Sequence, residues 1–222
     1  MRAGTLAVLA AVVAFAGPLQ AQRVVDKTVA TVSDGTRTEL ITFSDLLWQL
    51  ALEPRSSVTD PTSADLNRAL QTTINQRLFA LEAERLPRLA PTDEEIVAEI
   101  NRLLAYFPST AEFEKRLNKV GFTSVRDDNF ERIIGQRIVI DKYLDFRFRS
   151  FIVITAEDEA KYYRDVFVPD FRRRYPGLLM PTLDEKRADI RGILQEERVA
   201  SGIEAFLDEA KRRAEIVILS EV

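Results

Sequence analysis

Residues 183–219 read LDEKRADIRGILQEERVASGIEAFLDEAKRRAEIVIL, and this stretch decides the fold. Its spacing predicts one long helix, from about Leu183 to Ala214, that is held against a long partner over several turns. The run Glu215–Leu219 that follows is rich in β-branched residues and predicts a short strand. The apolar residues that recur in the helix at heptad spacing are Ile193, Ala200, Ile203, Leu207, Ala210 and Ala214.

The strand at Glu215–Leu219 needs partners, and an early hairpin supplies them. Lys27–Ser33 and Thr36–Ile41 have strand-like patterns and flank Asp34-Gly35, a strong hairpin turn. A lone hairpin is only marginally stable in water. We therefore expect the late strand to lie beside the hairpin as a third strand.

Nearly all of the chain between these strands is predicted to be helical. Thr92 is followed by Glu95 three residues on, the pattern of a capping box, in which side-chain oxygens accept the free backbone N–H groups of a helix start. Amphipathic stripes run through residues 66–81, 96–107 and 124–151. The fold class is therefore mainly α, with a small β-sheet formed by the N-terminal hairpin and a C-terminal strand. Helix starts of the same kind follow Thr42, Ser109, Thr155 and Thr182.

The composition excludes most familiar site chemistry. The 222 residues contain neither histidine nor cysteine, which removes Ser-His and Cys-His nucleophiles, disulfides, and metal sites built on imidazole or thiolate. The net charge of -4 gives no broad attraction to nucleic acid. No glycine pattern fits a nucleotide-binding loop. The carboxylate pairs at 94–95, 127–128 and 196–197 point about 100° apart on a helix and do not converge. We expect neither catalysis nor a cofactor.

Residues 1–21 have the pattern of a secretory signal peptide. Arg2 precedes the apolar run Leu6–Ala16, Gly17-Pro18 breaks it, and Ala21 is a small residue suited to cleavage. The apolar run is shorter than the roughly 20 residues of a membrane span. We expect cleavage near Ala21 and a soluble protein exported to the periplasm, without stable membrane insertion. A retained N-terminal anchor is the alternative.

The rest of the chain, residues 22–222, is predicted to form a single domain. The hairpin and most helices occupy 22–164, and the last helix and strand occupy 182–222. Between them, residues 165–181 read DVFVPDFRRRYPGLLMP and hold three of the nine prolines. A helix does not run unbroken through such a segment.

The order of these segments resembles the SurA-like family of periplasmic chaperones and parvulin-type prolyl isomerases. The segments that carry the resemblance read VSDG, ITFSDL, ALQTTINQRLFALEAERL, PTDEEIVAEINRLLAYF, STAEFEKRLNKVGFTSVRDDNFERII, ITAEDEAKYY and RRAEIVIL. The resemblance covers nearly all of residues 22–222 and implies a helical peptide-binding domain of the SurA and trigger-factor type.

One departure from the family removes its catalytic part. In the family, a parvulin domain of about a hundred residues follows the segment that corresponds to ITAEDEAKYY, far more than an ordinary connection. Here the 165–181 connector leads directly to the last helix. Parvulin sites rely on histidines, and this chain has none. The resemblance therefore implies the chaperone module without isomerase activity.

A chaperone that captures extended apolar chains needs exposed hydrophobic surface. Nine of the nineteen aromatic residues lie between 143 and 175, and core packing is the alternative for each of them. Trp48 stands alone on the first helix and fits a groove edge or the core. Arg172–Arg174 fits an anionic client or a lipid head group, but we favour a solvated face. The candidate peptide-binding residues are Trp48, Tyr143, Phe146, Tyr162, Tyr163, Phe167, Phe171, Tyr175, Leu178, Leu179 and Met180.

The sequence thus predicts an ATP-independent holdase with an exposed apolar groove. Its expected partners are unfolded exported polypeptides, among them precursors of outer-membrane β-barrels, which it holds by reversible burial of apolar segments. The alternative is a structural or adaptor protein of the cell envelope with one fixed partner. We expect no nucleic-acid partner, and the sequence leaves open whether the protein is a monomer or a homodimer.

Overall fold

The computed structural model describes residues 26–86 and 90–222 and is mainly α-helical, with one small β-sheet. The predicted fold class is confirmed, including the sheet built from the early hairpin and the late strand. The predicted signal peptide lies outside the described residues. In chain order the elements are β1 (Thr28–Ser33), β2 (Thr38–Thr42), α1 (Phe43–Ala51), α2 (Ser63–Ala83), α3 (Asp93–Leu104), α4 (Thr110–Lys119), α5 (Asp128–Leu144), the π-helical turn η1 (Asp145–Arg149), α6 (Ala156–Tyr162), the π-helical turn η2 (Tyr163–Phe167), α7 (Val168–Arg174), α8 (Leu183–Arg213) and β3 (Glu215–Ile218).

The sheet has the order β2-β1-β3, and both neighbouring pairs are antiparallel. Thr31 in β1 pairs with Leu40 on one side and Val217 on the other. The hairpin turn contains Gly35 at a φ of 86°, a conformation that glycine adopts freely. The Asp34 carboxylate accepts the hydroxyl of Thr36 at 2.6 Å and the backbone N–H groups of residues 36 and 37 at 2.9 Å each. These bonds, the hydroxyl bond most of all, hold the pKa of Asp34 far below its ordinary value.

Side-chain caps begin the helices where the sequence predicts them. Thr42, Thr92, Thr155 and Thr182 each form a complete capping box, and Ser109 accepts the N–H of Glu112 at 3.2 Å. The start of α5 moves from the predicted Ser124 to Asp128, because the Asp127 carboxylate caps the helix there by accepting the N–H of Asn129 at 3.0 Å. Thr62 forms a further capping box with Asp65, which the sequence reading did not identify.

These capping carboxylates determine how acid affects the fold. Hydrogen bonds from the Thr62, Thr155 and Thr182 caps lower the pKa of Asp65, Asp158 and Glu185. A carboxylate with a lowered pKa in the folded state stabilises the fold above its unfolded pKa, and that contribution is lost as the pH falls through the folded pKa. Protonation of Asp141 has the opposite effect on the stability of the fold, because burial raises the pKa of its carboxyl group.

We expect the free energy of unfolding to be constant between about pH 8 and pH 5.5 and to decrease below about pH 4.5, where unfolded carboxylates begin to bind protons. The plateau follows because the chain has no histidine to titrate in that range. Urea unfolding at a series of pH values measures this profile. A slope between pH 6 and 8 would contradict it.

Aromatic rings fill the core at the end of the molecule where α1 and α4 lie. Phe113 and Phe130 are fully buried with ring centroids 5.9 Å apart, and Phe107 and Phe122 complete the cluster at 4.5 and 5.5 Å. Gly121 ends α4 at a φ of 99°, so that the chain turns back and places the Phe122 ring in this cluster.

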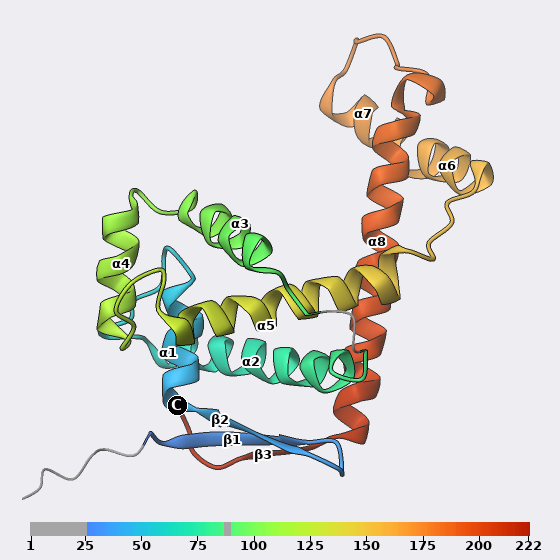
Figure 1. The fold of residues 1–222 in the computed structure, drawn as a ribbon. Helices are drawn as coiled ribbons and strands as arrows, with labels where there is room; N and C mark the ends of the chain where they lie inside the picture. The colour runs from blue at the N-terminus through green and yellow to red at the C-terminus, as the bar shows by residue number, and fades with distance from the viewer. Residues whose placement is uncertain (1–25, 87–89) are drawn as a thin grey trace, which may run out of the picture.

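The long helix α8 divides the molecule into two parts. Figure 1 shows the C-terminal half of α8 beside α2 and α5, while its N-terminal half projects away from them together with α6 and α7. We call residues 145–200 the arm and the other described residues the body. No helix within residues 26–86 and 90–222 has the length and apolar character needed to cross a membrane.

In the arm, α6, η2 and α7 form one continuous bent helix that ends at Arg174. The Val168 N–H donates to the carbonyl of Tyr163, five residues back, so the helix widens by one π turn immediately before Pro169. A proline ring fits there because the regular pattern of helical backbone hydrogen bonds is already interrupted.

The predicted heptad stripe of α8 is wrong in the first half of the helix. Ile193 is 43% exposed and Ala200 is also exposed, whereas Ile190 and Val199 are buried. The helix has two partners in place of one: α6 contacts its first half and the body contacts its second half. The two partners cover different faces, so a single stripe does not describe the burial.

Candidate functional site

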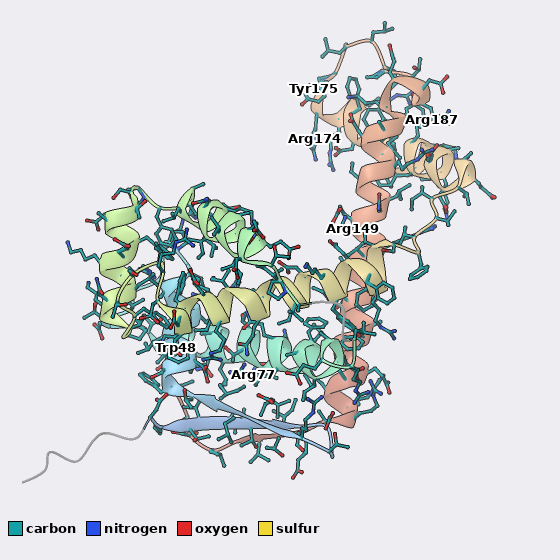
Figure 2. The ribbon with its side chains drawn as sticks, in the orientation of Figure 1. Trp48, Arg77, Arg149, Arg174, Tyr175 and Arg187 are labelled. Atoms are coloured by element: carbon teal, nitrogen blue, oxygen red, sulfur yellow. The ribbon has the colours of Figure 1, made fainter. Side chains whose placement is uncertain are left out.

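A fully buried carboxylate fastens α6 to α8 in the arm. Glu159 has no exposed surface, and its oxygens contact Arg191 at 2.6 Å and Arg187 at 3.3 Å. About two turns further along α8 from Arg191, Arg198 pairs with Asp158 at 2.9 Å. Figure 2 labels Arg187 on the arm. Because both arginine side chains remain partly exposed, the charges are satisfied at the edge of the interface and α6 is held in one position.

Four aromatic rings form a continuous ladder along η2 and α7. Tyr163, Phe167, Phe171 and Tyr175 are spaced four residues apart, and successive ring centroids are separated by 5.4, 5.7 and 5.1 Å. The Tyr163 hydroxyl donates to the carbonyl of Pro181 at 2.6 Å and so ties the start of the ladder to the start of α8. The ladder rings other than Tyr175 are half-buried. The structure thus brings these four candidate residues together.

A second apolar group lies where the arm joins the body. Phe146 and Phe151 meet edge to face with centroids 6.0 Å apart, and they are 51% and 73% exposed. Val153 follows them along the chain, and Ile193 lies on α8 one turn before Glu196. We call Phe146, Phe151, Val153 and Ile193 the arm-base surface.

Charged groups border the arm-base surface. Arg149 contacts Asp145 at 3.0 Å and forms an ion pair with Glu196 of α8. This guanidinium lowers the pKa of Glu196, so the rim remains ionised at neutral pH. Phe148 turns the other way and packs on α8, where the absence of a side chain at Gly202 leaves room for its ring.

The arm contains four further candidate residues, which belong neither to the ladder nor to the arm-base surface. Tyr162 is half-buried beside the ladder, and burial, assisted by Glu197 and Asp170, raises its pKa. After α7, Leu178 and Leu179 are exposed and Met180 is half-buried.

The prediction that Tyr143 belongs to the exposed surface is wrong. Its side chain is 4% exposed and meets the ring of Phe206 of α8 edge to face at 6.2 Å. Tyr143 lies on the face of α5 that α8 crosses, whereas Phe146, three residues on, lies outside that crossing. Burial raises the pKa of the Tyr143 hydroxyl.

Trp48 is not brought together with the other candidates. It is half-buried in the body, its ring lies 5.3 Å from that of Phe122, and its Nε1–H donates to the carbonyl of Val120 at 3.0 Å. Figure 2 shows it at the end of the body away from the arm. Trp48 therefore joins α1 to the end of α4, which agrees with the core-packing alternative.

The sequence reading missed a mostly apolar pocket of about 460 Å³ in the body. It lies between α2, α5 and the start of α3. Gly135 lies in the middle of α5 beside the pocket, and a Cβ there would be in ordinary contact with the Pro91 ring at 3.4 Å. The glycine inside the helical pattern of α5 was the feature of the sequence that could have indicated this pocket. The apolar lining includes Ala80, Pro91, Ile96, Gly135 and Val139.

The geometry of the arm supports binding and offers no obvious chemistry. Within the described residues, no group of three or more aspartate or glutamate side chains is placed to hold a metal ion. Ion pairs of Asp158 and Glu159 with arginines of α8 join two helices of the arm. No protein-family model matches this chain, and no curated protein matches it.

Proposed function

We propose that this protein is an ATP-independent holdase that binds unfolded exported polypeptides on the apolar surface of its arm and delays their aggregation. The observation that carries the proposal is where exposed apolar side chains gather. Most of the large hydrophobic side chains that are exposed in the described residues belong to the arm. They are Phe146, Phe151, Val153, Val166, Tyr175, Leu178, Leu179 and Ile193.

The arm-base surface is suited to sequence-tolerant binding. A phenylalanine that is about half exposed offers roughly 100 Å² for burial, or about 2.5 kcal/mol at 25 cal/mol per Å² before ordering costs. Two such rings therefore give weak, reversible contact with any extended apolar segment. The ionised rim at Arg149 and Glu196 keeps the surface soluble when no client is bound.

The location and the clients are part of the same proposal. The signal-like residues 1–21 support export to the periplasm. The resemblance to SurA-like chaperones supports precursors of outer-membrane β-barrels as clients, whose unpaired strands and apolar side chains aggregate before folding. Release needs no chemistry in this scheme, because a client that completes its own fold withdraws its apolar segments from the arm.

A light-scattering assay tests the proposal. We expect the purified protein at near-stoichiometric amounts to slow the aggregation of an unfolded β-barrel precursor. The double variant Phe146→Ser/Phe151→Ser removes two exposed rings without opening the core, and we expect it to require about tenfold more protein for the same effect.

The matched control is Tyr106→Ser, which removes a ring that is also exposed but lies in the body, in the turn after α3. It should act as the parent protein does. An equal loss in both variants, or no effect of the parent protein on scattering, contradicts the proposal. Crosslinking that captures one folded partner and no unfolded clients would favour the adaptor alternative.

A further inference from the structure

The end of the arm presents two adjacent leucines almost completely to solvent. Leu179 is 94% exposed and Leu178 is 64% exposed, and Tyr175 beside them is 50% exposed. Figure 1 shows the loop between α7 and α8 at the end of the arm farthest from the sheet. We call Arg172–Met180 the tip.

A turn fixes the tip in this exposed form. The Leu178 N–H donates to the carbonyl of Tyr175 at 3.3 Å, with Pro176 and Gly177 at the centre of the turn. Gly177 has a φ of 89°, as the third position of a type II turn requires. Directly before the turn, the Tyr175 ring packs on the ring of Phe171 at 5.1 Å. The leucines therefore point outward as part of a built structure.

Positive charge gathers at the same place. From Val168 to Pro181 the chain carries three arginines and one aspartate, although the whole protein is net negative. Arg173 and Arg174 share the single carboxylate of Asp170, which is 2.9 Å from Nε of Arg174. No ion pair to any residue that the structure describes reaches Arg172. Figure 2 labels Arg174 and Tyr175 at this end of the arm.

Exposed leucines bordered by three arginines, which one carboxylate neutralises only in part, are complementary to a surface that is apolar inside and anionic outside. An acidic peptide would satisfy the arginines but gives no general reason for two leucines to stand beyond them. A phospholipid surface satisfies both, because leucine and tyrosine side chains enter the boundary below the head groups while arginines contact the phosphates.

We propose that the tip docks on the surface of anionic phospholipid membranes. Each arginine near such a surface strengthens binding about fivefold, and a single short apolar loop adds only a shallow insertion. The docking is therefore peripheral and reversible, and it leaves the arm-base surface free. The proposal does not depend on client binding at the arm-base surface, which involves other residues.

Flotation with lipid vesicles tests this inference. We expect the protein to bind vesicles of phosphatidylcholine and phosphatidylglycerol, to bind phosphatidylcholine vesicles much more weakly, and to lose binding to anionic vesicles as salt rises. The triple variant Arg172→Gln/Arg173→Gln/Arg174→Gln should bind anionic vesicles about 100-fold more weakly. Leu178→Ser/Leu179→Ser should weaken binding to both kinds of vesicle by about tenfold.

Both tip variants change exposed residues, and circular dichroism verifies that each remains folded. Tyr106→Ser is again the control and should bind as the parent protein does. The inference is overturned if the parent protein does not float with anionic vesicles, or if the tip variants float as well as the parent. It is also overturned if the arginine variant keeps vesicle binding but loses binding to an acidic peptide.

Discussion

Replacing Arg116 with methionine is expected to lower the free energy of unfolding by about 3 kcal/mol. The guanidinium reaches from α4 to the end of α1, where its Nε donates to the carbonyl of Ala51 at 2.8 Å and its Nη2 donates to that of Leu50 at 2.6 Å. It also donates to the carbonyls of Glu53 and Ser56 in the turn that follows. One side chain thus bonds four carbonyls at the end of α1 and in the turn that follows, of which those of Leu50 and Glu53 also accept a backbone N–H.

Burial lowers the pKa of Arg116, but a guanidinium remains protonated at neutral pH. Methionine keeps the apolar stem and removes every donor. Arg116→Lys keeps the charge without the planar fork and should recover less than half of the loss. The control is Lys115→Met on the same helix, where a solvated side chain makes only a distant ion pair at 3.8 Å, and a change below about 0.5 kcal/mol is expected. Urea unfolding that gives the same value for both methionine variants would refute this role of Arg116.

Replacing Glu159 with glutamine should release the arm locally without unfolding the body. The amide keeps the shape of the side chain but removes the charge that holds Arg187 and Arg191. Because these arginines remain hydrated, we expect a cost of about 2 kcal/mol, which corresponds to about 30-fold faster amide hydrogen exchange in α6. Exchange in β1 and α2 should not change.

The control for this experiment is Asp184→Asn, since Asp184 also pairs with Arg187 but is almost fully exposed. It should leave exchange in α6 unchanged. Faster exchange throughout the chain in the Glu159 variant would show that the arm and body unfold together, and unchanged exchange in α6 would show that the ion pairs do not fasten it.

Local chemistry explains which parts of the fold were predictable. A capping box such as Thr92 with Glu95, the Asp34-Gly35 turn and the stop at Gly121 each act within a few residues, so the sequence reveals them. Thr62 and Asp65 have the same chemistry, and they were missed because Thr62 lies in the polar run of residues 56–63, whose composition indicates a loop.

Exposure on the arm was less predictable, because it depends on where distant helices cross. Tyr143 and Phe146 lie three residues apart in one aromatic-rich stretch, yet α8 covers the first and leaves the second exposed. The pairing of Glu159 with α8 joins residues about thirty positions apart. Its only trace in the sequence is the spacing of Arg187 and Arg191 by four, which places them on the same face of a helix.

Photocrosslinking from position 151 tests the central claim most directly. A photoreactive phenylalanine derivative replaces Phe151 at the arm base in one protein and Tyr106 in the body in another, and each is mixed with an unfolded β-barrel precursor. We expect crosslinks to the precursor from position 151 and few from position 106. Equal crosslinking from the two positions, or none from position 151, would contradict it.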